Sequence, residues 1–223
     1  MLKKPILTID GPAASGKGSV SKKIAQDFNL YYLETGIFYR LLALEFLSSD
    51  ADLKNLNSFL SVLSINFLNM LNIKNKKLFD KKVSYLASVL AKEKLVRNFV
   101  VNQQKTILQQ YPTIFSGIIL DGRDCGTVIA PEADLKIYMT ASLELRAQRR
   151  HAQMQNSSDS HSYEDVYNEL KLRDKRDMER ELSPLMIADG AVEVDSTSIS
   201  LEETINIVKK IIFSKLPYLK IKI

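Results

Sequence analysis

The stretch PILTIDGPAASGKGS, residues 5–19, decides the fold that this sequence predicts. Its first part, 5–10, is an apolar run that is typical of a short buried strand, and Gly11 and Pro12 end that run. Between residues 17 and 28 the apolar side chains recur at helical spacing. A strand, a glycine-bearing turn and a helix in this order are typical of the first unit of an α/β sheet.

The turn inside this stretch has the composition of a phosphate-binding loop. Gly11 and Gly16 let the backbone fold around a phosphate without Cβ clashes, at the positive end of the helix dipole. Lys17 can reach the β- and γ-phosphates of a nucleotide, and Ser19 can place its hydroxyl on Mg²⁺. The strict pattern has Ser or Thr directly after the lysine, but Gly18 stands there, an ending similar to that of nucleoside monophosphate kinases. We expect the whole loop to bind phosphates: Gly11, Pro12, Ala13, Ala14, Ser15, Gly16, Lys17, Gly18 and Ser19.

Four further apolar runs predict strands, and two further runs predict helices. The strands are expected at 30–33, 117–120, 135–139 and 191–194, and the helices at 38–47 and 200–214. We therefore predict an α/β fold with a parallel five-stranded sheet. Asp10, Asp121 and Asp195 stand where three of the strands end, and ligands bind beyond the carboxyl ends of strands in such sheets. Aspartate also favours turns, which explains any one of them equally well.

The composition is that of an ordinary soluble globular chain. Of the 223 residues, 45% are hydrophobic and 26% are charged, which excludes a disordered chain. One cysteine excludes an internal disulfide framework and a cysteine-built zinc site, and two histidines make a histidine-rich metal centre a poor fit. The chain has no run of 18 apolar residues and no visible secretory segment, so we expect no membrane helix and a cytoplasmic location.

The charges favour a phosphate-bearing partner over a nucleic acid. The net charge of +5 suits an anionic partner, and six of the nine arginines lie between 146 and 180. Arginine presents a rigid fork that matches phosphate oxygens. From Lys136 to Glu181, however, nine basic residues are balanced by nine acidic ones. A nucleic-acid groove would be one-sided, so we expect no nucleic-acid partner.

Two stretches break the alternation of strands and helices. Residues 52–95 are rich in Asn, Leu and Lys and look like an insertion between the second and third strands. Residues 151–163 are polar and almost free of aliphatic side chains, which predicts a mobile loop between two charged helices.

Phosphoryl chemistry needs an acidic group and several cations beside the loop. Asp121 ends an apolar strand, as the acidic partner of a phosphate loop does, and could hold Mg²⁺ directly or through water. The cations that could hold donor and acceptor phosphates are Arg40, Arg97, Arg123, Arg173 and Arg180. Asp174 and Asp177 could instead pair locally with arginines of the same helix, and for any single arginine a solvated face is the commoner explanation.

Four segments resemble one known family. They read LTIDGPAASGKGS (7–19), LETGIFYR (33–40), DGRDCGTVIAPEADLKIYMTASLELRAQRR (121–150) and RDKRDMERELSPL (173–185). The chain resembles the bacterial cytidylate kinases, which phosphorylate CMP and dCMP with ATP. The match runs from about residue 5 to 210 and is weakest over 48–83. The D-G-R-D-x-G-T-V pattern separates this family from adenylate and thymidylate kinases.

The resemblance implies a three-layer P-loop NTPase core with a nucleoside monophosphate (NMP)-binding insert and a short lid. It implies one kinase domain, 1–223, with a core at 1–50 and 96–223, an insert at about 51–95 and a lid at about 149–175. The implied reaction moves the γ-phosphoryl group of ATP to CMP or dCMP, in pyrimidine nucleotide metabolism, with Mg²⁺ as cofactor. The resemblance also implies that the protein is a monomer. Its partners would be these nucleotides, and it would bind neither nucleic acid nor a membrane.

The resemblance also assigns roles to matching residues. The loop 11–19 would bind the ATP phosphates, and Arg149 and Arg150 would belong to the lid over ATP. Lys17, Asp121, Arg123 and Arg180 would be catalytic, and Ser19 and Asp121 would hold the metal. The acceptor nucleotide would be bound by Thr35, Arg40, Ser88, Arg97, Arg123, Asp124, Arg173, Asp177 and Arg180. Of these, Ser88, Arg97 and Asp124 would read the cytosine.

Three alternatives to this function are open, and one of them, a nucleic-acid-binding protein, is disfavoured by the balanced charges. The nearest alternative is another small-molecule kinase on the same core, acting on a different monophosphate. A regulatory protein that hydrolyses ATP or GTP without a small acceptor is a further one, and a GTPase is disfavoured because Asn75-Lys76-Lys77 is followed by Leu78 where an N-K-x-D signature has Asp. The family usually carries a D-V-S-x-x-I-R-T stretch that KKLFDKKVSYLAS (76–88) lacks. Either the insert is truncated and cytidine contacts are lost, or the true chain is longer than 223 residues.

Overall fold

The computed structural model describes residues 4–49, 51–64, 76–154 and 162–222. The chain divides into two compact units, which are treated separately below. The first unit comprises Met1–Glu34 and Tyr111–Ile223, and the second comprises Thr35–Gln110. The functional bounds of the insert and of the lid stay predictions.

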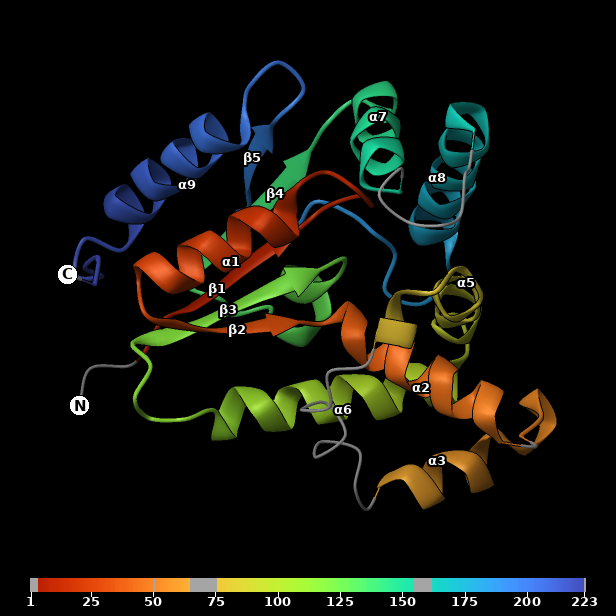
Figure 1. Cartoon of the computed structure of the whole chain (residues 1–223). Coiled ribbons are helices and arrows are strands. Elements are labelled where there is room, and N and C mark those ends of the chain that lie inside the picture. The colour runs from red at the N-terminus through yellow and green to blue at the C-terminus, as the bar shows by residue number, and fades with distance from the viewer. Residues whose placement is uncertain (1–3, 50, 65–75, 155–161, 223) are drawn as a thin grey trace. The chain divides into compact units, whose positions relative to one another are not determined.

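The first unit is built on one parallel sheet. Its elements are β1 (Ile6–Asp10), α1 (Lys17–Asp27), β2 (Leu30–Glu34), β3 (Gly117–Gly122), the single π-helical turn η3 (Cys125–Ile129), β4 (Leu135–Thr140), α7 (Leu143–Met154), α8 (Tyr163–Glu179), β5 (Val192–Asp195) and α9 (Leu201–Lys215). The five strands lie in the order β2-β3-β1-β4-β5, and every pairing is parallel (Figure 1). The predicted α/β fold with a parallel five-stranded sheet is therefore confirmed.

The register of the sheet brings acidic residues to its carboxyl edge. Asp10, the last residue of β1, pairs with Gly122 of β3. Glu34, the last residue of β2, pairs with Asp121. Because parallel strands end on the same side, these three carboxylates stand at one edge, where the loops that follow the strands begin.

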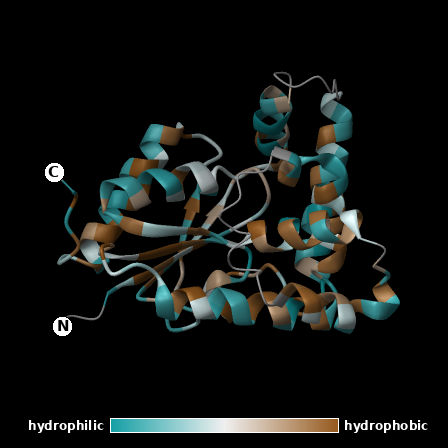
Figure 2. Cartoon of the chain, turned by 60° about the horizontal axis from the view of Figure 1, so that its bottom comes forward, coloured by the Kyte–Doolittle hydropathy of each residue, from teal (hydrophilic) through white to brown (hydrophobic). Residues whose placement is uncertain are grey.

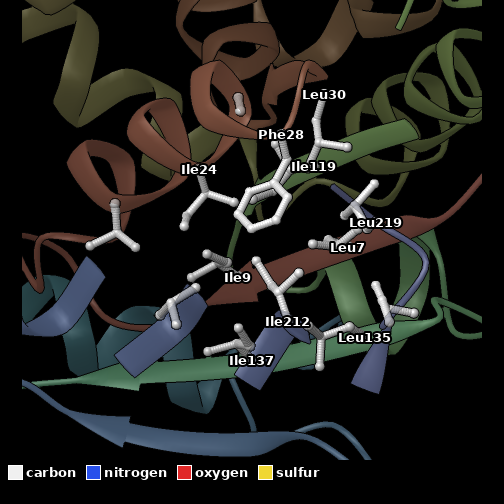
Figure 3. Close-up of a cluster of buried hydrophobic side chains, with 14 of the residues drawn as sticks. Leu7, Ile9, Ile24, Phe28, Leu30, Ile119, Leu135, Ile137, Ile212 and Leu219 are labelled. Carbon is white, nitrogen blue, oxygen red and sulfur yellow. The ribbon is translucent and has the colours of Figure 1, made fainter. Parts of the chain in front are cut away.

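The main core lies between the sheet and two helices, α1 and α9. Ile24 and Phe28 of α1 point toward Ile9 and Ile119 of the sheet, and Ile212 of α9 joins the same cluster (Figure 3). Each of these side chains is almost completely buried, so the cluster supplies the apolar burial that holds α1 against β1. Since α1 begins at Lys17, this packing also fixes the position of the loop before it.

The prediction of a loop over the polar residues 151–163 is wrong at both ends of that range. Helix α7 continues through Met154, and α8 begins at Tyr163, where a capping box between Ser162 and Asp165 supports its first turn. The remaining residues of the stretch, 155–161, lie outside the described residues.

The second unit is helical throughout its described part. It contains α2 (Gly36–Ser48), η1 (Leu53–Asn55), α3 (Leu56–Ser64), η2 (Lys76–Phe79), α5 (Lys81–Leu90) and α6 (Lys94–Gln110). Helices α2 and α5 pack on each other, with Phe38, Leu42 and Leu90 completely buried. Helices of both units carry hydrophilic and hydrophobic residues side by side, as amphipathic helices do (Figure 2).

Candidate functional site

The loop between β1 and α1 has a glycine near each end, Gly11 and Gly16, and the backbone at both takes a conformation that favours glycine. Gly11 has φ 154°, and a Cβ there would collide with the backbone carbonyl of Met139. Gly16 has φ 90° and is the N-cap of α1, so no side chain caps the first turn of the helix. Ala14, with φ 59°, is held in the left-handed region as well. The uncapped amides at the start of α1 form a site suited to an anion.

Lys17 is the one residue of this loop with a buried ammonium group. Its side chain is 8% exposed and donates a hydrogen bond from Nζ to the Pro12 carbonyl, 3.1 Å away. Burial and the nearby charge of Arg123 lower the pKa of Lys17 to about 8, although Asp121 acts in the opposite direction. A bound phosphate would supply the negative charge that this cation lacks, so the loop is electrostatically prepared for an anion.

Asp121 is held beside the loop by a residue that the sequence did not single out. The Tyr32 hydroxyl, on β2, donates a hydrogen bond of 3.0 Å to Asp121 Oδ2. Burial and the charges of Asp121 and Glu34 raise the pKa of Tyr32, so the phenol remains a donor. A Cβ at Gly18 would lie 3.1 Å from the same Oδ2. The absence of a side chain at residue 18 therefore leaves room for Asp121 directly beside Lys17.

Asp10 fixes the turn that follows β3. Its carboxylate accepts hydrogen bonds from the backbone amides of Cys125 (2.9 Å) and Gly126 (2.7 Å). Burial raises the pKa of Asp10 in spite of these two bonds. The backbone carbonyl of Asp124 begins η3 by accepting bonds from Val128 and Ile129. The segment 121–124 is therefore held at both ends, by the pairing of β3 on one side and by the bonds of the following turn to Asp10 of β1 on the other.

Arg123, Asp177 and Arg180 form a partly buried charged cluster. Arg123 Nε donates to Asp177 Oδ2 at 2.9 Å, and Arg180 lies 3.9 Å from Asp177 Oδ1. Burial acts to raise the pKa of Asp177, but the charges of Arg123, Arg173 and Arg180 outweigh it and lower that pKa. Arg180 stands just after α8, where its Nε donates to the Ser183 carbonyl at 2.6 Å. Three arginines around one carboxylate leave a surplus of positive charge for an anionic ligand.

Arg149 lies against the phosphate loop in this structure. It donates to the Ser15 carbonyl at 3.4 Å and to the Ser196 hydroxyl and carbonyl at 3.2 and 3.1 Å. Burial lowers the pKa of this guanidinium. Arg150 follows on the same helix and is half-buried. The Ser15 hydroxyl is buried and has no hydrogen-bond partner among the described residues, which leaves it free for a ligand oxygen.

The second unit holds four residues of the predicted acceptor site. Thr35 is buried, and its carbonyl accepts from Gln104 Nε2 at 3.1 Å. Arg40 donates to the Ser84 hydroxyl at 2.6 Å and to the Leu78 carbonyl at 3.0 Å. Ser88 donates to the Tyr85 carbonyl, and Arg97 donates to the Ala91 carbonyl and lies over the Tyr39 ring. The other predicted acceptor residues, Arg123, Asp124, Arg173, Asp177 and Arg180, belong to the first unit.

Within the first unit, the predicted donor residues and the predicted catalytic residues lie together. The charges of Asp121 and Asp177 act on both Lys17 and Arg123, and Arg123 also acts on Lys17. Sequence reasoning missed Tyr32 and Arg146, whose contacts depend on residues far along the chain. The alternating acidic and basic residues of 173–180 were the available sign of ion pairs, but that pattern suggested partners within the same helix.

Two other features are absent from the described ranges. No helix in them is long and apolar enough to cross a membrane. Nor do the described residues hold a group of three or more His, Cys, Asp or Glu side chains that could bind a metal by themselves.

Comparison with solved structures supports the fold alone. The chain aligns with an uncharacterized protein from Eubacterium ventriosum at a TM-score of 0.54 and 12% identity, covering 95% of this chain and 99% of the other. It aligns with TT1252 from Thermus thermophilus at a TM-score of 0.50 and 16% identity, covering 96% and 99%. Together with the glycine-bearing loop at the end of β1, Lys17 and Asp121, this fold defines the class of P-loop kinases.

Comparison of sequences gives the particular family. The cytidylate kinase family model matches residues 7–214. A cytidylate kinase of Bacillus cereus (strain B4264) is 36% identical over 224 residues, covering 95% of this chain and 97% of the relative. A cytidylate kinase of Bacillus thuringiensis (strain Al Hakam) is 35% identical over 217 residues, covering 92% and 94%. The chain belongs to the cytidylate kinase family.

Proposed function

We propose that this protein transfers the γ-phosphoryl group of ATP to CMP or dCMP, giving ADP and CDP or dCDP. The family match over residues 7–214 carries the proposal, because it includes both the donor loop and the D-G-R-D segment. The proposal includes a monomer in the cytoplasm that works on free nucleotides and has no nucleic-acid or membrane partner.

On the donor side, the loop 11–19 binds the phosphates of ATP. Its amides surround the phosphate oxygens, and the buried ammonium of Lys17 neutralises charge on the β- and γ-phosphates. Arg149 and Arg150 belong to the lid over ATP. Closure of that lid excludes water, which would otherwise hydrolyse the donor.

On the acceptor side, arginines hold the phosphate of the acceptor nucleotide close to the γ-phosphate of ATP. Thr35 and Arg40 hold the acceptor nucleotide, and Arg123 contacts its phosphate. Arg173 and Asp177 contact its sugar, while Arg180 approaches the transferred group. Ser88, Arg97 and Asp124 read the cytosine through its amino group and ring edge. The cluster of Arg123, Asp177 and Arg180 supports this part, because its net positive charge suits a transition state with charge spread over phosphoryl oxygens.

The residues present fit a magnesium ion that arrives with the nucleotide. Mg²⁺ keeps several waters and is usually held by one or two protein oxygens together with substrate phosphates, so no cage of three protein ligands is needed. The exposed hydroxyl of Ser19 and the carboxylate of Asp121 are the oxygens that would hold it. When bound, the ion would neutralise charge on the β- and γ-phosphates.

The proposal is tested by transfer of radiolabelled phosphate from ATP to a panel of monophosphates. CMP and dCMP are expected to be labelled in preference to UMP and AMP. Preferred labelling of UMP or AMP would point to another small-molecule kinase on the same core. Loss of label in Lys17→Ala, which is expected to stay folded, controls for a contaminating kinase.

A further inference from the structure

Arg146 is a buried arginine that none of the roles above uses. It lies on α7 and is 6% exposed. Its Nε donates to the Ala141 carbonyl at 2.9 Å, and its Nη1 donates both to the Ala13 carbonyl at 3.2 Å and to Asp174 Oδ2 at 2.5 Å. A single guanidinium therefore connects the loop after β4, the phosphate loop and helix α8.

Asp174, its partner on α8, depends on this arginine. The carboxylate is 5% exposed, and its second oxygen, Oδ1, is buried without a hydrogen-bond partner among the described residues. Arg146 is the one ion-pair partner that the described part of the chain gives it. A buried carboxylate without its cation is costly, so removal of Arg146 alone would leave Asp174 without its ion-pair partner.

The surroundings of the pair place it between donor and acceptor groups. Helices α7 and α8 lie side by side (Figure 1), and Ala147, Val166 and Leu170 form a small apolar cluster with Ala13 of the phosphate loop. Asp174 directly follows Arg173 and stands one helical turn before Asp177. Whatever fixes Asp174 also fixes the part of α8 that carries the proposed acceptor residues.

We propose that Arg146 is a positioning residue, which holds α8 in register with the phosphate loop through Asp174 and the Ala13 carbonyl. The proposed acceptor-binding residues on α8, Arg173 and Asp177, are thereby kept at a set distance from the donor phosphates. The inference rests on the function proposed above. Arginine suits this role because its planar fork supports bonds in three directions at once, which the single ammonium of lysine cannot reproduce.

The decisive variant replaces both partners with apolar side chains, Arg146→Met with Asp174→Leu. Replacing one partner of a buried pair destabilises a protein, whereas replacing both is often neutral. We expect Arg146→Met alone to melt at a lower temperature and the double variant to recover part of that loss, because the Ala13 and Ala141 carbonyls still lack their donor. We expect kcat of the double variant to stay lower by on the order of 10- to 100-fold, because the reacting groups are out of register. The KM for ATP should rise by less than kcat falls, since the loop loses only the bond to the Ala13 carbonyl.

A readout without substrate separates this inference from the proposed function. In the double variant, hydrogen exchange of the amides in 163–179 should accelerate, while exchange of the sheet stays as in the wild type. The matched control is Lys175→Met with Glu179→Leu, which removes an exposed pair on the same helix and should change neither kcat nor exchange.

The outcomes are distinct. A double variant with wild-type kcat, or with wild-type exchange over 163–179, overturns the positioning role. A wild-type protein that labels neither CMP nor dCMP overturns the proposed function, while the exchange result still stands on its own. If the double variant fails to fold, Arg146→Lys replaces it: near-wild-type melting with reduced kcat supports the inference, and wild-type kcat overturns it.

Discussion

The Tyr32 hydroxyl and the Asp121 carboxylate meet at 3.0 Å, across the neighbouring strands β2 and β3. The oxygen that accepts this bond, Oδ2, also lies 3.1 Å from the place that a Cβ on Gly18 would occupy. Asp121 is therefore confined on one side by a phenol and on the other by a helix that has no side chain at that point. The next two predictions test one side of this arrangement each.

Tyr32→Phe removes the phenolic hydroxyl and with it one hydrogen bond to a buried carboxylate. We expect the free energy of unfolding to fall by about 1.5–3 kcal/mol, the usual contribution of a hydrogen bond to a charged group, as measured by urea denaturation. Tyr31→Phe is the matched control, because Tyr31 points to the other face of β2, where its ring stacks on Tyr111. Equal losses in the two variants would argue against a special role of the Tyr32 hydroxyl.

Gly18→Ser creates the strict phosphate-loop pattern, with serine directly after Lys17. The new Cβ would press on Asp121 Oδ2, so we expect kcat to fall by about tenfold, although serine is the better helix former. Steady-state rates with CMP measure the effect. Ser21→Ala in the same helix removes a buried hydroxyl that has no partner among the described residues, and it should be tolerated. Full kcat in Gly18→Ser would show that Asp121 has more room than its contacts indicate.

Lys17 makes ATP capture dependent on pH. Its pKa is lowered to about 8 by burial and Arg123, so the free enzyme loses the phosphate-binding cation above that pH. We expect kcat/KM for ATP to be flat below pH 8 and to decline by about tenfold per pH unit above it. The kcat itself should stay flat to higher pH, because bound phosphates favour the ammonium form.

The control for this pH dependence is Lys17→Arg, whose guanidinium stays charged over the whole range. Its kcat/KM should be lower at every pH but should show no decline near pH 8. ATP binding measured by calorimetry at pH 7 and pH 9 gives the same comparison without turnover. A decline that persists in Lys17→Arg would assign it to another group.

Asp124→Ala tests the proposed reading of cytosine. Asp124 is 5% exposed and follows Arg123 in the D-G-R-D segment. A lost hydrogen bond to a charged group corresponds to roughly 10- to 100-fold in binding, so we expect the KM for CMP to rise by that order, with the KM for ATP nearly unchanged. Initial rates at varied CMP and at varied ATP separate the two constants. An unchanged KM for CMP would count against base recognition by this residue.

The sheet could be predicted because its signals are local. A strand was expected at 117–120 and is found at Gly117–Gly122, and another was expected at 30–33 and is found at Leu30–Glu34. Short apolar runs bounded by glycine or acidic residues predict the position of a strand to within a residue or two. The loop before α1 was equally visible, because its glycines and lysine lie within nine consecutive residues.

The contacts that organise the site could not be predicted in this way. Asp174 was expected to pair within its own helix if at all, but it pairs with Arg146, 28 residues earlier. Asp177 pairs with Arg123, 54 residues earlier, in addition to its long contact with Arg180. Such partners depend on how helices pack, whereas residue spacing along one chain reports only on neighbours within a few turns. The roles assigned to these residues stay predictions.

The two hydrogen bonds that the Asp10 carboxylate accepts from the amides of Cys125 and Gly126 leave different room for a side chain at these two residues. At residue 125 the backbone amide makes its bond whatever the side chain is, but the thiol is completely buried and also hydrogen-bonds to Asp10, so only a small replacement fits. Gly126 has no such latitude, because a Cβ there would lie 3.0 Å from the Thr8 hydroxyl and 3.2 Å from Ala188. A mutational scan should therefore find residue 126 the less tolerant of the two, with only small apolar side chains accepted at residue 125, and a bulky label on the completely buried Cys125 should disrupt the turn.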